Sequence, residues 1–268
     1  MQQEIEVQGL RLSPQQKRLW LWQQQGHAGS ARAIIVLDGS VDEPVVQGAL
    51  CDVIARHESL RTSFYRQPGM KLPFQVVEAE PELDWQVLDL RHLEEDEKTQ
   101  AADQAAQQRG EWDWERGPLV RALFCRWSPA HTRLFLDVPG LCADTRSLSN
   151  LTAELSCSLR RSGVLEDEPV QYSHYSEWQH ELIEGDEAAQ GRAWWDRRKL
   201  TDENHLVLPF ERDHAFAGIE ASSRTVLRGF SASEMERLRN RAAAAQVSLP
   251  LLLCGCWVAL LYRMTLEP

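Results

Sequence analysis

The side chains of this sequence that could exchange protons or bind metals near neutral pH include eight histidines and six cysteines. Histidine is the most frequent general base, because its ordinary pKa lies close to neutrality. A Ser-His-Asp trio can nevertheless be assembled by choice from eight histidines, so composition alone predicts no hydrolase. The sequence also contains no G-x-x-x-x-G-K-[ST] phosphate loop, no G-x-G-x-x-G fingerprint and no G-x-S-x-G elbow.

Two pairs of candidate metal ligands are present, and neither predicts a metal site. His174 and His180 are six residues apart and lack a matching carboxylate or cysteine array. Cys254 and Cys256 form a C-x-C pair, but residues two apart do not share a helix face and no second pair of ligands lies nearby. We interpret the six cysteines, which are scattered through apolar segments, as reduced, buried and small hydrophobic residues.

Three segments carry residue orders that are more specific than any isolated histidine. Residues 56–64 read RHESLRTSF, residues 13–22 read SPQQKRLWLW, and residues 172–178 read YSHYSEW. In this order and spacing they resemble three signature motifs of the condensation domains of nonribosomal peptide synthetases. The first agrees with R-H-E-x-L-R-T-x-F at every fixed position, namely Arg56, His57, Glu58, Leu60, Arg61, Thr62 and Phe64. The other two depart from the family at Gln15, Trp22 and His174.

The resemblance implies a chloramphenicol-acetyltransferase-like fold, in which two similar lobes form a V with a tunnel between them. It also implies a reaction, in which the amine held by one carrier protein attacks the thioester held by another. The phosphopantetheine arms belong to those partner carrier proteins, so the domain itself is expected to bind no cofactor directly. In the family the second histidine of H-H-x-x-x-D-G lies at the midpoint of the tunnel, where it is implied to position or deprotonate the amine or to stabilise the tetrahedral intermediate.

The segment that resembles this histidine motif is residues 138–147, VPGLCADTRS, and it has lost both histidines. Pro139 and Gly140 stand in their places, whereas Asp144 and Ser147 align with the family. Cyclising relatives carry D-x-x-x-x-D-x-x-S instead, of which only Asp144 and Ser147 remain. Neither proline nor glycine can exchange a proton or donate a side-chain hydrogen bond, so we expect no catalytic residue here.

Two further roles follow from the resemblance. The aspartate of the motif is implied to pair with the second arginine of the signature, so Asp144 and Arg61 are expected to form a salt bridge that holds the loop in place. His57 could act as a substitute base, but the family's signature motif contains this histidine in addition to the separate catalytic histidine. A packing role for His57 is therefore the favoured interpretation.

The composition is that of an ordinary globular protein, with 43% hydrophobic and 26% charged residues among 268. The formal net charge of −11 argues against a nucleic-acid partner, which would require an excess of Lys and Arg. Residues 1–9 lack the features of a secretory signal. The longest apolar run, residues 249–261, is too short to span a bilayer and is better suited to a buried helix. We therefore expect a cytoplasmic protein without a membrane partner.

Alternating helices and strands predict an α/β fold with an α+β mixed sheet, because residues 118–138 read as a hairpin. Strands are predicted at 33–37, 62–65, 74–77, 118–127, 133–138 and 225–230. Helices are predicted over 94–108, 177–195 and 231–246, and from Ser13, Asp42, Asp144 and Ser248 onward. We expect residues 1–170 to form the condensation-like N-terminal lobe, and 171–268 the crossover region and the truncated start of a second lobe.

Two functions remain open at this point. The favoured one is a non-catalytic platform of a peptide synthetase, which docks a carrier protein, an adenylation domain or a trans-acting tailoring enzyme. The alternative is an acyltransferase that forms an amide or ester bond by positioning its substrates and whose second lobe has been removed. In either case residues 249–261 are expected to form an exposed apolar patch or to self-associate.

Overall fold

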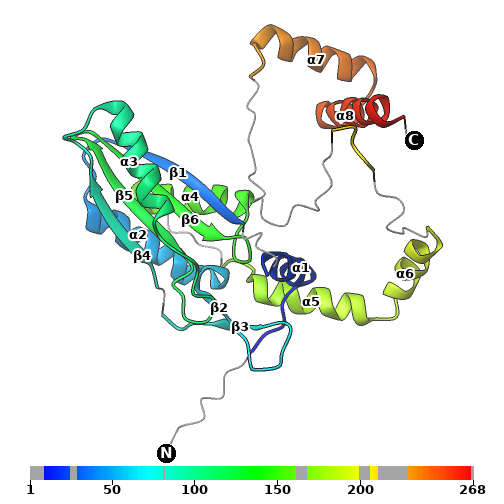
Figure 1. Ribbon diagram of the computed structural model, residues 1–268, viewed down its shortest axis with the longest axis horizontal. Helices are drawn as coiled ribbons and strands as arrows, with labels where there is room; N and C mark the ends of the chain where they lie inside the picture. Colours follow the sequence, from blue (N-terminus) through cyan, green and yellow to red (C-terminus); the bar gives the residue numbers. More distant parts are fainter. Residues whose placement is uncertain are drawn as a thin grey trace, which may run out of the picture. The chain divides into compact units, whose positions relative to one another are not determined.

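Figure 1 shows the computed structural model of the protein, which describes residues 9–24, 29–80, 82–160, 168–198, 206–210 and 229–266. The chain divides into two compact units, Met1–Ala188 and Ala189–Pro268, and each is described by itself. The predicted division after residue 170 falls earlier in the chain. The difference arises because the helix that begins at Tyr172 is bonded to the first unit, as detailed below.

The first unit is built on a four-stranded sheet with the strand order β1-β6-β5-β4 (Figure 1). Its strands are β1 Ser30–Asp38, β4 Asp84–Asp89, β5 Arg121–Ser128 and β6 His131–Pro139. Strand β6 pairs antiparallel with β1 and β5, whereas β5 pairs parallel with β4. The predicted mixed sheet and its hairpin are confirmed.

Three strands, β2, β3 and β4, differ from the sheet predicted from the sequence. The strands predicted at 62–65 and 74–77 are present as β2 Thr62–Tyr65 and β3 Phe74–Val77, but they form a separate two-stranded sheet. Strand β4 was not predicted, because its sequence DWQVLD is short and carries aspartate at both ends. It is held by contacts distant in sequence: Asp84 Oδ2 lies 3.2 Å from Nη1 of Arg109. Tertiary contact rather than local propensity therefore defines this strand.

Most helices begin and end close to their predicted limits. In the first unit they are α1 Pro14–Gln23, α2 Glu43–Arg56, the 3₁₀ turn η1 Glu58–Arg61, α3 Glu95–Gln107, α4 Thr145–Arg160 and α5 Tyr172–Glu184. They are followed by α6 Ala188–Arg197, α7 Ala232–Ala244 and α8 Leu249–Thr265. The single helix predicted over 177–195 is instead divided between α5 and α6 at Gly185, which ends α5. Capping boxes start α1 and α7, each with a serine that bonds reciprocally to the side chain and backbone three residues on.

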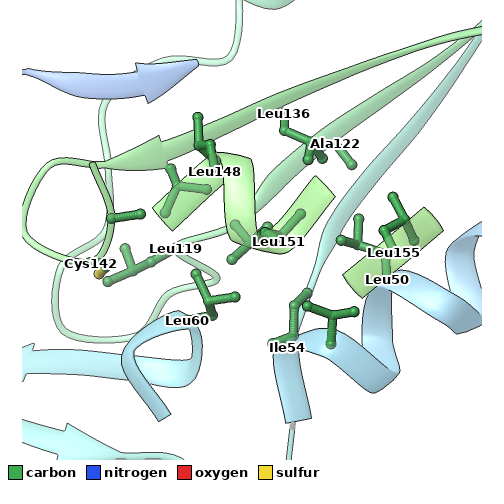
Figure 2. Close-up of a cluster of buried hydrophobic side chains, with 14 of the residues drawn as sticks. Leu50, Ile54, Leu60, Leu119, Ala122, Leu136, Cys142, Leu148, Leu151 and Leu155 are labelled. Carbon is green, nitrogen blue, oxygen red and sulfur yellow. The ribbon is translucent and has the colours of Figure 1, made fainter. Parts of the chain in front are cut away.

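The two faces of the four-stranded sheet pack against different helices. Along β5, Ala122 and Phe124 lie in a hydrophobic cluster with residues of α2 and α4, whereas Leu123 and Cys125 lie in another cluster with Ala102 of α3. This alternation is the two-residue period of a strand. Figure 2 shows the larger cluster, in which leucines of α4 meet Leu50, Ile54 and other residues.

Helix α8 departs from the expectation of burial, since none of its described residues is buried. The apolar side chains that are more than 40% exposed are Leu251, Leu253, Trp257, Val258, Leu260 and Tyr262. An exposed apolar patch is therefore present on this helix, as one of the two expected outcomes. The strand predicted at 225–230 lies largely outside the described residues.

The cysteines are less uniformly buried than expected. All six cysteines are free, but only Cys125 and Cys142 are buried, so the expectation of burial is wrong for the exposed Cys254 and Cys256.

No single helix of the described ranges is long and apolar enough to span a bilayer. Helices α7 and α8 meet that requirement only as a pair bent by 91°.

The core predicts a contrast between two identical substitutions in helices. Leu50→Ala removes a fully buried side chain of α2 and should lower the free energy of unfolding by about 2–5 kcal/mol. Leu21→Ala in α1 removes a side chain that is 50% exposed and should cost less than about 1 kcal/mol. Urea denaturation followed by circular dichroism measures both changes. Equal losses would contradict the assignment of the core.

Candidate functional site

The motif loop, residues 139–147, leaves the sheet at the end of β6. Pro139 is the last residue of β6 and pairs with Ser30 of β1. Its carbonyl oxygen then accepts hydrogen bonds from the backbone N–H groups of Cys142 and Ala143 at 2.9 and 3.1 Å. The chain therefore turns sharply immediately after the sheet.

Gly140 lies against the neighbouring backbone. Its N–H donates to the carbonyl oxygen of Gly29 at 2.9 Å. A Cβ atom added at position 140 would lie 3.2 Å from the same oxygen, closer than most Cβ contacts. A histidine at this position would therefore require the backbone near residue 29 to shift.

The side chains at the tip of the loop are buried in the core of the first unit. Leu141, Cys142 and Ala143 are each less than 9% exposed and belong to the main core. Burial raises the pKa of the Cys142 thiol to about 12. Cys142 is therefore a neutral thiol at physiological pH and cannot act as a thiolate nucleophile or base.

Asp144 and Ser147 start helix α4. The Asp144 carboxylate accepts hydrogen bonds from the backbone N–H and the hydroxyl of Ser147 at 2.7 and 2.8 Å, and the Asp144 N–H donates to the Ser147 hydroxyl at 3.2 Å. This is a reciprocal N-terminal cap. The bonds from Ser147 hold the pKa of the Asp144 carboxyl below its usual value.

The structure does not bring Arg61 and Asp144 together. The Arg61 guanidinium donates instead to the carbonyl oxygens of Ala55, at 3.2 Å, and Glu78. Asp144 is occupied by Ser147, and no ion pair among the described residues links it to Arg61. Both side chains thus fix their own local backbone and not each other.

His57 is held by a carboxylate of α4. Its Nε2 lies 2.9 Å from Oε2 of Glu154, which is also 3.5 Å from Nε of Arg56. His57 lies beside a pocket of about 130 Å³ lined by residues of the signature segment, the motif loop and α4: His57, Ser59, Leu60, Ala143, Ser147, Asn150 and Leu151. The pocket thus joins the signature segment to the motif loop.

The other signature residues connect this segment to the core and to α5. Glu58 accepts a 2.6 Å hydrogen bond from the Ser173 hydroxyl, and its own N–H donates to Oε1 of Gln171 at 3.0 Å. Gln171 in turn donates to the carbonyl oxygen of Arg56 at 3.1 Å. Leu60 and Phe64 are buried in the main cluster, and the Thr62 hydroxyl donates to the Glu58 carbonyl at 2.6 Å.

The opening segment, residues 13–22, also bonds to α5. The Ser13 hydroxyl lies 2.8 Å from the Tyr172 hydroxyl. The buried Gln16 amide donates to Oε1 of Gln75 at 2.8 Å and to the carbonyl oxygen of Leu141 in the motif loop at 3.0 Å. All three signature segments and the motif loop are therefore linked by hydrogen bonds.

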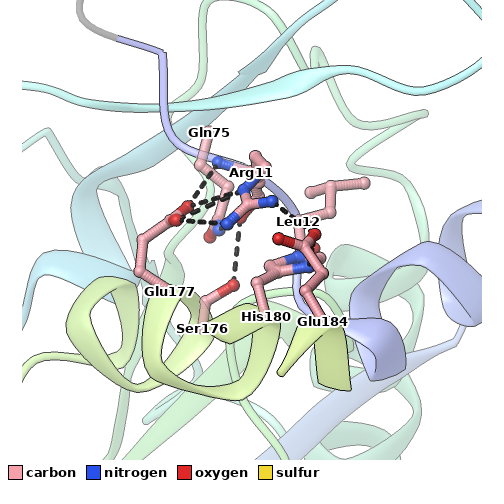
Figure 3. A network of polar contacts seen from close by, with 7 residues as sticks. All are labelled: Arg11, Leu12, Gln75, Ser176, Glu177, His180 and Glu184. Atoms are coloured by element: carbon pink, nitrogen blue, oxygen red, sulfur yellow. Dashed lines mark hydrogen bonds and ion pairs between the residues drawn. The ribbon is translucent and has the colours of Figure 1, made fainter. Parts of the chain in front are cut away.

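Arg11 adds a charged clasp on α5, shown in Figure 3. Its guanidinium lies 2.9 Å from Oε2 of Glu177 and 2.8 Å from Oε1 of Glu184. The Arg11 carbonyl accepts from the Ser176 hydroxyl at 3.0 Å and from Nε2 of Gln75 at 2.8 Å. These bonds place α5 in the first unit.

A family model described as "Condensation domain" matches residues 7–267. The chain belongs to the condensation-domain family. Chondramide synthase cmdD of Chondromyces crocatus is 35% identical over 226 residues, which are 79% of this chain and 6% of the relative. CymA of Salinispora arenicola, a probable non-canonical nonribosomal peptide synthetase, is 31% identical over 269 residues, 95% of this chain and 3% of the relative. The chain thus spans only a small part of these relatives' length.

Solved structures show the same fold at lower identity. The condensation domain of the monacolin K polyketide synthase MokA is 17% identical with a TM-score of 0.73, over 96% of this chain and 60% of that chain. A complex of the X-domain and OxyB from teicoplanin biosynthesis is 23% identical with a TM-score of 0.69, over 96% of this chain and 57% of that chain. The chloramphenicol-acetyltransferase-like fold class is therefore confirmed.

Several residues that build the site of this condensation domain were missed in the sequence. Glu154, Gln171 and Gln75 lie outside the three signature segments, yet their side chains hold His57, Arg56 and Gln16. Glu154 carried a usable signal, since it follows the buried Leu151 of α4 by three residues, about one helical turn. Among the described residues, no group of three or more metal-ligating side chains is placed to hold a metal ion.

The cap of α4 predicts a pH-dependent effect at Asp144. Asp144→Ala should lower the free energy of unfolding by about 0.5–2 kcal/mol at pH 7, whereas Asp144→Asn, which can still cap, should cost only a few tenths. Because the folded pKa is depressed, the advantage of aspartate over asparagine is fully present above its unfolded pKa of about 3.9 and is lost as pH falls from there through the lower folded pKa. Denaturation from pH 7 to 3 measures it. An advantage that grows on acidification would contradict the cap.

The clasp on α5 predicts a difference between its two carboxylates. Glu177 accepts hydrogen bonds from the N–H, Nε and Nη2 of Arg11, whereas Glu184 accepts one from Nη1 and is 61% exposed. Glu177→Ala should cost about 1 kcal/mol, and Glu184→Ala a few tenths. Amide hydrogen exchange in α5 measures the two losses. An equal or larger effect at Glu184 would refute the ranking.

Proposed function

We propose that this condensation domain is a catalytically impaired module of a nonribosomal peptide synthetase and that it works as a docking or structural platform. The carrying observation is the motif loop. Pro139 and Gly140 stand where the family has histidines, and neither offers a proton acceptor. Of the titratable groups around them, Cys142 is a buried thiol and Asp144 is bound into the cap of α4.

The partners we propose are carrier-protein and adenylation domains of the synthetase, or a tailoring enzyme that acts in trans. The domain would bind no cofactor directly, since the phosphopantetheine arm would be carried by the carrier protein. The complex of an X-domain with OxyB offers a precedent for a partner bound to this fold. The linked signature segments would supply the rigid scaffold that such a platform requires.

The alternative is an acyltransferase that forms an amide or ester bond between carrier-bound substrates. One observation favours it: the His57 and Glu154 pair, at 2.9 Å, borders a pocket that also contains Ser147. A histidine oriented by a carboxylate is a common arrangement of a general base. Substrate positioning alone could add further rate enhancement.

An amide-formation assay with two loaded carrier proteins tests the proposal. We expect no product above background, because the family's general base is absent and such a base is typically worth ~10²–10⁴ in rate. Gly140→His should also be inactive, since its Cβ would crowd the Gly29 carbonyl and Pro139 restricts the preceding backbone. A relative with both motif histidines is the positive control.

Two comparisons keep the assay decisive. Gly140→Ala carries the same Cβ without an imidazole, so its stability separates crowding from chemistry at position 140. His57→Gln removes the candidate base and keeps a hydrogen-bonding side chain beside Glu154. Product formed by the unchanged domain and abolished by His57→Gln would overturn the platform and establish the acyltransferase.

A further inference from the structure

A second and larger pocket, of about 750 Å³, lies in the first unit beside the end of α1. It shares no lining residue with the pocket beside His57. Four aromatic side chains form its apolar part: Trp20, Phe64, Trp112 and Trp114. Its volume is within the range of sites that accept a small molecule or a side chain with its adjoining backbone.

The segment GEWDWERG, residues 110–117, already binds a guanidinium of its own chain. The guanidinium of Arg121 lies 3.8 Å from the ring centroid of Trp112. The same group donates hydrogen bonds to the carbonyl oxygens of Gly110, at 2.9 Å, and Glu111, at 2.8 Å. Stacking on an indole together with forked donation is characteristic of arginine and is not reproduced by lysine.

The second indole of the segment is turned into the pocket's aromatic group. Trp114 packs edge-on against Trp20, with ring centroids 6.1 Å apart, and against Phe64 at 6.2 Å. Trp114 remains partly exposed, whereas Phe64 is fully buried. Unlike Trp112, it carries no guanidinium among the contacts of the described residues.

The polar rim of the pocket is acidic. Glu111, Asp113 and Glu115 line it with exposed side chains, against the single guanidinium of Arg66. None of these four charges takes part in an ion pair within the described part of the chain. Three carboxylates around indole rings favour a cation that can stack and donate hydrogen bonds at the same time.

Trp20 is the most deeply buried of the three indoles that line the pocket. Trp20 lines the pocket and is 6% exposed, and its buried Nε1 has no hydrogen-bond partner among the described residues. Buried indole N–H groups normally have an acceptor. Because Trp20 lines the pocket, its indole signal should report on what occupies the pocket.

We propose that this pocket binds an arginine side chain presented by a partner protein. The guanidinium lies between Trp114 and the carboxylates of Glu111 and Glu115. The pocket gives the domain a specific point of attachment. This inference stands whether or not the domain forms amide bonds, because none of its residues belongs to the motif loop or the His57 pocket.

Nuclear magnetic resonance of the full chain with ¹⁵N-labelled tryptophan tests the proposal. The probe is the peptide acetyl-Gly-Arg-Gly-amide, with acetyl-Gly-Gln-Gly-amide as the uncharged match and methylguanidinium as the free cation. The indole signals of Trp20 and Trp114, assigned with Trp→Phe variants, should shift and saturate with the arginine peptide. The glutamine peptide and methylguanidinium should each bind at least about five-fold more weakly.

Charge variants test the rim. Glu111→Gln and Glu115→Gln should each weaken binding of the arginine peptide by about two- to five-fold, and added salt should weaken it further. Glu181→Gln, which makes the same change on an exposed residue of α5, should have no effect. The unchanged indole signals of the other tryptophans confirm that each variant is folded.

Three results would overturn the proposal. The first is no saturable shift at Trp20 and Trp114. The second is equal binding of the glutamine peptide, or binding that is insensitive to the double variant Glu111→Gln and Glu115→Gln. The third is methylguanidinium that binds as tightly as the peptide, which would assign the pocket to a free organic cation in place of a partner's arginine.

Discussion

The side-chain amide of Gln16 joins three parts of the first unit that are far apart in sequence. Its oxygen accepts from the Ser13 N–H at 2.9 Å, which closes the cap of α1, while its nitrogen donates to Gln75 of β3 and to the carbonyl of Leu141 in the motif loop. Gln16 and Gln75 are each 3% exposed. Removing one partner would leave several buried polar atoms unpaired, at about 1–3 kcal/mol each. The motif loop therefore depends on an amide near the start of the chain.

This dependence explains why the signature segments can be intact while the histidine motif is not. Glu58, Ser13 and Arg11 all bond to α5, so the segments recognised as family motifs are contacts among α1, η1 and α5. Those contacts are needed to form the lobe, whatever chemistry follows. Proton transfer needs only the side chains at the end of β6. A loop held in place by Gln16 can thus change these side chains and keep its position.

The parts of the fold that could be predicted are those that local pattern determines. Helix α2 follows from its apolar spacing and α1 from Ser13 and Gln16, because each is encoded within a few residues. Strand β4 could not be predicted, since Arg109 and Arg121 hold it through Asp84. The pairing of Arg61 with Asp144 failed for a related reason. Each charge met a local partner, a backbone carbonyl or a helix cap, and nearby groups compete well against a distant ion pair.

The same competition for partners limits what the motif loop can do chemically. A general base must have a lone pair available for the substrate's proton, at a pKa near the working pH. Cys142 fails on pKa, because burial keeps its thiol protonated. The Asp144 carboxylate is ionised, but the two hydrogen bonds that its Oδ1 accepts from Ser147 lower its basicity.

His57 has a suitable side chain, but the bond from its Nε2 to Glu154 also links the signature segment to α4. Freeing Asp144 for chemistry would remove the cap that starts α4, and freeing His57 would remove a contact between α4 and the signature segment. In a family member with histidines at positions 139 and 140, the base would be an additional side chain that does not hold α4 or the signature segment in place. Catalysis and scaffold would then use different residues. In this domain the titratable groups that remain near the loop already serve the scaffold, so the absence of histidine at positions 139 and 140 leaves these scaffold contacts intact.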